Sequence, residues 1–164
     1  MNEQLPLKTK KRYRVEELRK SVQDIEILQL ARMFAEEVDL EEYIDEETLI
    51  LSCIKCRNDL ERKSVNTFIA YDNYDPIGFL VGIASPCFHR PGIVAEQKLW
   101  YVVPQRRATI APILLVRAYE KWARINGATQ IYTGSANAPL SEKTSKLLEH
   151  LNYRKVGAIH VKEI

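Results

Sequence analysis

The sequence predicts a single domain of the mixed α/β class (α+β mixed), with about four helices against a central sheet. Its 164 residues, 46% hydrophobic and 28% charged, suit one soluble domain with its own core. Runs with helical spacing alternate along the chain with runs rich in β-branched and aromatic residues. In the most specific stretch, an apolar strand ends at Pro104, passes through a basic turn and restarts as an amphipathic helix. Because free N–H groups and a positive dipole end gather where a helix begins, this turn predicts an anionic, phosphorylated ligand.

A strand and two helices are expected first. Residues 13–20 read as the strand, and Ser21 is the predicted N-cap of a helix of about 17 residues. The apolar face of that helix is formed by Val22, Ile25, Leu28, Ala31, Phe34 and Val38. An acidic break over residues 39–47 is followed by a second helix that carries residues 49–60, and the acidic residues 45–47 suit its first turn because they complement its dipole.

The three cysteines, Cys53, Cys56 and Cys87, are too few and too uneven for a disulfide framework. Cys53 and Cys56 form a lone C-x-x-C pair, and they share one helix face with Leu49 and Leu60. No second ligand pair accompanies them. We therefore expect buried thiols that pack as small apolar residues and not a metal site.

The middle of the chain changes to β periodicity. Residues 65–71 and 76–85 are expected to form a hairpin, and a loop at 86–92 contains His89, which we take as a solvated loop residue. A strand at 94–103 leads into the basic turn. The helix after it has an apolar face and ends at Asn126 and Gly127. That face consists of Ala111, Leu115, Ala118, Trp122 and Ile125.

The last third is expected to add a strand at residues 129–134, a fourth helix and a closing strand at 153–161. Pro139 and Ser141 open the helix, and Asn152 is its expected left-handed cap. The apolar face of this helix is Leu140, Thr144, Leu147, Leu148 and Leu151. The chain contains no internal repeat and no linker.

The net charge of +2 is too small to indicate a nucleic-acid partner, although the N-terminus is locally basic. Residues 1–12 are expected to form an exposed basic arm, which is either simply frayed or docks on an acidic protein partner. No aromatic and basic stripe accompanies it, which disfavours nucleic acid. No apolar run approaches the ~18 residues of a membrane span, and no signal peptide is evident. We expect a location in the cytoplasm, or in a particle assembled there.

Three stretches, at residues 99–107, 120–128 and 147–157, carry a resemblance to the GNAT superfamily of N-acetyltransferases, and in particular to the small GNAT-like proteins of tailed bacteriophages. Residues 99–107 are similar to the family's apolar strand, proline and basic turn. Residues 120–128 resemble its helix end, and residues 147–157 resemble its last helix with the aromatic residue that follows. The resemblance in element order covers about residues 13–163, so residues 13–164 are taken as one GNAT-like domain.

The resemblance implies a mixed, mostly antiparallel sheet in which two parallel strands, at 94–103 and 129–134, splay apart around acetyl-coenzyme A. Its pyrophosphate would lie on the turn, against backbone amides of residues 107–111 and two arginine side chains. The pantetheine arm would pair with backbone groups of the strand end. Asn137 would bond the pantetheine amide or only cap the last helix. The residues assigned to the coenzyme are Val102, Val103, Arg106, Arg107, Ala108, Thr109, Ile110, Ala111 and Asn137.

The resemblance also implies a base and a proton donor for acetyl transfer. Glu96 stands where family members often carry the base, although it also reads as an ordinary strand carboxylate. The position of the usual donor tyrosine is Leu148. Tyr132, Ser135, Tyr153 or water would then have to donate the proton instead.

The turn departs from the family's glycine pattern. With Gln105 in first place, Ala108 and Ile110 take the glycine positions; with Arg106 first, Thr109 still replaces a glycine. Two functions stay open. One is an acetyl-CoA-dependent N-acetyltransferase that acts on an amine of a small molecule or a protein. The alternative is a non-catalytic GNAT-fold protein with a degenerate coenzyme site, used as a structural or binding component, for example of a phage particle.

Overall fold

The computed structural model describes residues 12–39, 44–59, 61, 63–134 and 141–157. Five strands form one sheet in the order β1-β2-β3-β4-β5. The strands are β1 (Tyr13–Glu17), β2 (Val65–Asp72), β3 (Asp75–Pro86), β4 (Ile93–Val102) and β5 (Ala128–Tyr132). All neighbours are antiparallel except β4 and β5, which are parallel. The expected mixed sheet, mostly antiparallel with one parallel pair, is confirmed.

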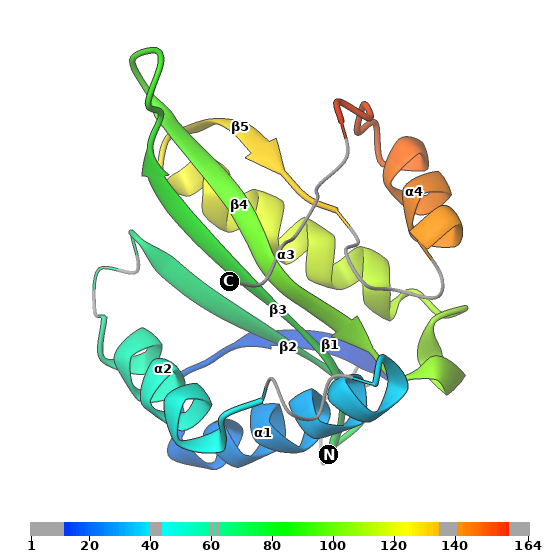
Figure 1. The fold of residues 1–164 in the computed structure, drawn as a ribbon. Coiled ribbons are helices and arrows are strands. Elements are labelled where there is room, and N and C mark those ends of the chain that lie inside the picture. Colours follow the sequence, from blue (N-terminus) through cyan, green and yellow to red (C-terminus); the bar gives the residue numbers. More distant parts are fainter. Residues whose placement is uncertain (1–11, 40–43, 60, 62, 135–140, 158–164) are drawn as a thin grey trace, which may run out of the picture.

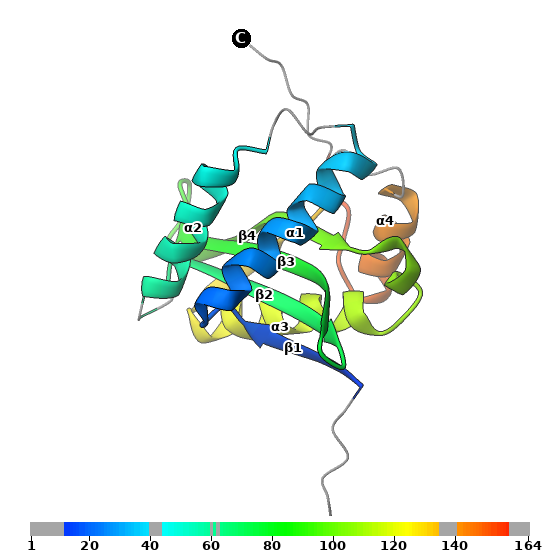
Figure 2. The same ribbon diagram turned by 90° about the horizontal axis from the view of Figure 1, so that it is seen from below.

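Four helices are described: α1 (Ser21–Glu37), α2 (Glu46–Asn58), α3 (Ala111–Ile125) and α4 (Ser141–His150). Helices α1 and α2 lie on one face of the sheet and α3 lies on the other, while α4 lies beyond the end of β5 (Figures 1 and 2). None of the described helices is long and apolar enough to cross a membrane. The helices thus sandwich the sheet and leave its β5 end next to α4.

The predicted start of the first helix needs one correction, and that of the second does not. Ser21 is not the cap of α1 but its first helical residue; the cap is Lys20, and the side-chain oxygen of Gln23 accepts from the Lys20 N–H at 2.8 Å. Helix α2 begins at Glu46 with Asp45 as its cap, which accepts from the Thr48 N–H at 2.6 Å, so the expected acidic first turn is confirmed for Glu46 and Glu47. In both places a local side-chain bond decided the start, which apolar spacing does not report.

The main core joins buried residues of the sheet to those of α3 and of α1. Tyr119 is fully buried and stacks on Trp122, with ring centroids 6.1 Å apart. The backbone of β3 approaches these rings closely at Gly82, where a Cβ would lie 2.6 Å from the Tyr119 ring. This contact fixes α3 against the middle of the sheet, and with it the turn that precedes α3.

A second apolar cluster lies between α1, α2 and β2. Cys53 and Cys56 are 5% and 3% exposed and pack with Leu18, Ile27 and Ile69. Burial raises the pKa of the Cys53 thiol to about 12 and also raises that of Cys56. The prediction that both act as small apolar residues is confirmed by this packing.

The C-terminal end differs from the expectation. Asn152 has φ 68°, so the left-handed cap of α4 is confirmed. Residues 153–157 form no strand, so the predicted strand at 153–161 is wrong over these residues; the remainder lies outside the described residues. The reason is local: the Tyr153 N–H donates to the Leu148 carbonyl oxygen at 2.9 Å, which keeps the chain turned back on α4.

Most of the predicted basic arm also lies outside the described residues. Its last residue, Arg12, pairs with Asp72 through two bonds of 2.8 and 3.0 Å. Asp72 is almost fully buried at the end of β2. The domain boundary proposed at residue 12 stays a prediction.

Candidate functional site

An opening between β4 and β5 is the main feature of the candidate site. The two strands pair in parallel from Ile93 with Ala128 to Glu96 with Tyr132. Beyond that pair, β4 runs on to Val102 along β3, whereas β5 ends and diverges from it (Figure 1). Among the described residues, no strand pairs with the β5 side of β4 over residues 97–102.

A bulge in β4 lies at the start of this opening. Val81 of β3 is opposite Leu99, but Gly82 is opposite Gln97, so Lys98 is the extra residue. Bulges bend a strand and redirect its side chains, and here the strand departs from its parallel neighbour. The bulge therefore coincides with the point where the two strands separate.

The two predicted catalytic residues, Glu96 of β4 and Tyr132 of β5, lie opposite each other where the strands separate. Glu96 and Tyr132 are register partners, so their side chains leave the sheet on the same face. The Glu96 carboxylate accepts from the Lys98 ammonium group at 2.8 Å, and its side chain is 41% exposed. The Tyr132 hydroxyl donates to the side-chain oxygen of Gln130 at 3.0 Å. Both groups are accessible to a substrate.

Gln97 bridges the opening, and the sequence analysis missed it. Its side-chain oxygen accepts from the Thr133 hydroxyl at 2.6 Å and from the Gly134 N–H at 3.1 Å. The local sequence around Gln97 does not show that its side chain bridges to Thr133 and Gly134. Its role depends on the bulge, which the spacing of β4 does not reveal.

The predicted pyrophosphate turn runs through a short 3-10 helix, η2 (Pro104–Arg106), into α3. Three of its five predicted amides already donate within the turn. The Arg107 N–H donates to Pro104, the Thr109 N–H to the Arg106 carbonyl oxygen, and the Ala111 N–H to the Thr109 hydroxyl. Ala108 and Ile110 are exposed, and their amides make no hydrogen bond to another described residue.

The strand end predicted to hold the pantetheine arm, Val102 and Val103, already uses part of its backbone in hydrogen bonds within the protein. The Val103 N–H donates to the Ile77 carbonyl oxygen at 2.9 Å, so it serves the pairing with β3. The Val102 carbonyl oxygen accepts from Nε of Arg107 at 2.8 Å. Asn137, the remaining predicted contact, lies outside the described residues.

Both predicted phosphate-binding arginines are paired with carboxylates. Arg107 makes a bidentate pair with Glu37 at the end of α1, with N–O distances of 2.6 and 2.5 Å. Arg106 donates to Asp72 at 2.9 Å, and the hydrogen bonds from Arg12 and Arg106 lower the pKa of Asp72. The positive charge of the turn is therefore balanced from two sides of the molecule.

A group of buried tyrosines lies behind the opening. The Tyr119 hydroxyl donates to the Tyr132 carbonyl oxygen at 3.2 Å, and burial raises the pKa of Tyr119, with smaller contributions from Tyr153 and Glu96. The Tyr153 hydroxyl is buried and has no hydrogen-bond partner among the described residues, and burial together with the Glu120 carboxylate raises its pKa. Both phenols thus stay protonated. Leu148 is buried, with 7% of its surface exposed.

Trp100 carries a second orphaned group. Trp100 lies on β4 beyond the bulge, opposite Leu80 of β3, and its buried indole N–H has no hydrogen-bond partner in the described part of the chain. Buried donors are nearly always satisfied by protein, water or ligand.

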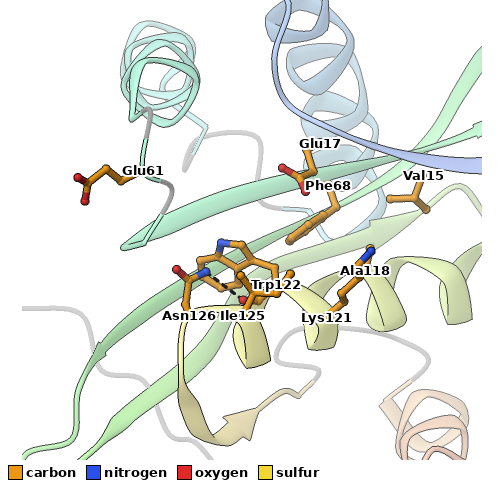
Figure 3. Close-up of a pocket in the computed structure, with 9 residues that line it drawn as sticks. All are labelled: Val15, Glu17, Glu61, Phe68, Ala118, Lys121, Trp122, Ile125 and Asn126. Carbon is orange, nitrogen blue, oxygen red and sulfur yellow. Dashed lines mark hydrogen bonds between the residues drawn. The ribbon is translucent and has the colours of Figure 1, made fainter.

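A separate pocket of about 440 Å³ lies at the other edge of the sheet, between β1, β2 and the end of α3 (Figure 3). It is lined by Val15, Glu17, Glu61, Phe68, Ala118, Lys121, Trp122, Ile125 and Asn126. Since β1 and β5 are the opposite edges of the sheet, this pocket is not part of the opening.

Comparison with solved structures identifies the architecture. An aminoglycoside acetyltransferase from an uncultured soil metagenomic sample, in complex with sisomicin, matches with a TM-score of 0.72 at 13% identity, over 93% of this chain and 96% of that chain. The protein has a GNAT-like fold. AAC(6')-Iy, in complex with the bisubstrate analogue CoA-S-monomethyl-acetylneamine, matches with a TM-score of 0.71 at 14% identity, over 93% and 97% of the two chains.

A ribosomal-protein-alanine N-acetyltransferase from Brucella melitensis biovar Abortus 2308 also matches, with a TM-score of 0.70 at 13% identity over 93% of this chain and 99% of that one. No protein-family model and no curated protein matches the sequence. At these identities the likeness concerns the fold. None of these three structures is described as a phage protein, so the resemblance to phage proteins stays a prediction.

Proposed function

We propose that the protein is an acetyl-CoA-dependent N-acetyltransferase that acetylates an amine of a small molecule or a protein. The observation that carries this proposal is the opening between β4 and β5, which starts at the bulge and has Glu96 and Tyr132 at its apex. Structures with the same fold include AAC(6')-Iy with a CoA-based bisubstrate analogue. That ligand joins the two kinds of molecule that the proposed reaction needs.

The residues of the opening suit the pantetheine arm of coenzyme A. Residues 97–102 offer a strand edge that no described strand covers, and an extended amide chain can add to such an edge. Binding along the strand end requires Arg107 to give up the Val102 carbonyl oxygen.

The turn suits the pyrophosphate once its ion pairs are exchanged. The amides of Ala108 and Ile110 are available at the start of α3, where the dipole favours an anion. Arg107 would leave Glu37, Arg106 would leave Asp72, and each would then bind a phosphate oxygen. This exchange lowers the net gain from binding and predicts modest affinity.

The proposed chemistry uses Glu96 and Tyr132, which pair across β4 and β5. The amine nitrogen attacks the thioester carbon, Glu96 takes a proton from the amine directly or through water, and the C–N bond forms as the C–S bond breaks. The leaving thiolate takes a proton from Tyr132 or from Tyr153, whose phenol stays protonated. With an acceptor amine in hand, Glu96→Gln should lower kcat by about 100-fold or more.

Thermal denaturation with acetyl-CoA tests the proposal. A ligand at about 100 times its dissociation constant stabilises a protein by roughly 2.7 kcal/mol, so the melting temperature should rise and saturate. The double variant Arg106→Ala with Arg107→Ala should weaken the effect. Absence of any shift, and of any heat in calorimetry at millimolar acetyl-CoA, would overturn the assignment.

The second candidate function is a non-catalytic GNAT-fold component that acts through its surface. The pairs of Arg107 with Glu37 and of Arg106 with Asp72, together with the buried Leu148, favour it. Its test is the double variant Ala108→Gly with Ile110→Gly. Coenzyme A binding by this variant but not by the parent supports a degenerate site, whereas tight binding by the parent rules it out.

A further inference from the structure

Gln97 holds a fixed position at the apex of the opening. It is the first residue of β4 after the last pair with β5, which is Glu96 with Tyr132. The bulge places it opposite Gly82, on the face of the sheet that Tyr119 contacts. From there its side chain reaches across to the chain that follows β5.

The orientation of its carboxamide follows from hydrogen-bond chemistry. A backbone N–H can only donate, so the atom 3.1 Å from the Gly134 nitrogen must be the carboxamide oxygen. The same oxygen accepts from the Thr133 hydroxyl at 2.6 Å. The NH₂ group therefore lies on the other side of the carboxamide, and no described residue accepts either of its hydrogens.

We propose that Gln97 is a catalytic residue whose NH₂ group donates to the carbonyl oxygen of the bound acyl thioester. This inference rests on the proposed acetyltransferase function. It follows from a locked carboxamide with an unused donor at the apex of the opening, one residue beyond the last pair of β4 with β5. The bridge to Thr133 and Gly134 holds the donor in place before the ligand arrives.

The role of such a donor is electrostatic. When the amine attacks the thioester carbon, the electron pair of the C=O π bond moves to oxygen, and the NH₂ group stabilises the charge that develops there. The charge returns to reform the carbonyl as the C–S bond breaks. Removing one preorganised donor of this kind costs about 100- to 1,000-fold in rate.

Two substitutions separate this role from a structural one. Gln97→Glu keeps an oxygen that can accept from Thr133 and Gly134 but replaces the NH₂ donor. Thr133→Val removes one bond of the bridge and leaves the donor unchanged. A purely structural role for Gln97 would make Thr133→Val the more damaging change, whereas the proposed role makes Gln97→Glu the more damaging one. Gln97→Met, which lacks donor and charge, controls for the added carboxylate.

The experiment compares calorimetric binding of acetyl-CoA and of S-ethyl-CoA, a thioether with a methylene in place of the carbonyl. The parent and Thr133→Val should prefer acetyl-CoA by about three- to tenfold, the worth of one hydrogen bond, and both Gln97 variants should lose that preference. Equal preference in parent and Gln97 variants overturns the inference while the proposed function stands. Failure of the parent to bind either ligand overturns both.

A spectroscopic measurement on the parent covers the case in which the variants do not fold. A hydrogen bond to the thioester oxygen weakens the C=O bond, so the infrared carbonyl band of acetyl-CoA should move to lower frequency on binding. An unshifted band for bound acetyl-CoA refutes the proposed donor.

Discussion

Replacing Glu37 by glutamine should destabilise the protein and, at the same time, improve its binding of coenzyme A. Glu37 holds Arg107 through two short bonds, and the two side chains are only 22% and 26% exposed. Glutamine has nearly the same shape but no charge, so the pair loses about 1.5–3 kcal/mol. At about 2–4 °C per kcal/mol for a chain of this length, the melting temperature should fall by roughly 3–12 °C.

The gain in binding has the same origin as the loss in stability. In the parent, Arg107 must leave Glu37 before it binds a phosphate, and in Glu37→Gln this cost is reduced. Since about 1.4 kcal/mol is a factor of ten, the affinity for coenzyme A should rise roughly tenfold or more. Glu36→Gln is the matched control, because Glu36 is the exposed neighbour on the same helix. A lower melting temperature with unchanged affinity would refute the competition between Glu37 and phosphate.

Three further predictions concern the fold. The pKa of Asp72 is lowered in the folded protein, so the contribution of this carboxylate to stability is complete above about pH 4 and disappears as the pH falls through the folded-state pKa. The free energy of urea unfolding should therefore depend less on pH between about 5 and 3 in Asp72→Asn than in the parent. Iodoacetamide should label Cys87 well before Cys53, because hydrogen bonds from the backbone of residues 89–90 lower the pKa of Cys87, whereas burial raises that of Cys53. Equal labelling rates in the folded protein would contradict the described packing. Gly82→Ala should cost about 1–3 kcal/mol or more in urea unfolding because its Cβ would meet the Tyr119 ring, whereas Gly157→Ala, with no atom within 4 Å, should change stability by less than about 0.5 kcal/mol.

The sequence predicts those parts of the fold that depend on neighbours in the chain. The apolar face of α3 repeats at helical spacing, and the hairpin of β2 and β3 is marked by a polar turn, so both were located within a few residues. The expected strand after Asn152 failed because one backbone bond, from Tyr153 to Leu148, redirects the chain.

The site was harder to predict because its contacts join residues that are distant in sequence. Arg107 finds its partner 70 residues away at Glu37, and Gln97 finds one 36 residues away at Thr133. Nothing near either residue signals these pairs. The basic turn was thus recognised from its local sequence, but its neutralisation by two carboxylates was not.

The two tryptophans of the chain occupy opposite settings, and this gives the protein an internal optical probe. Trp122 is enclosed by Tyr119 and Phe68, at ring distances of 6.1 and 6.2 Å. Trp100 is on the strand that borders the opening, and no described residue accepts from its indole N–H. Indole emission responds to hydrogen bonding and polarity at the ring. A molecule that enters the opening should therefore change the fluorescence of Trp100 and leave the fluorescence of Trp122 unchanged. A Trp122→Phe protein would thus report occupancy through one fluorophore, without a label and without knowledge of the acceptor amine.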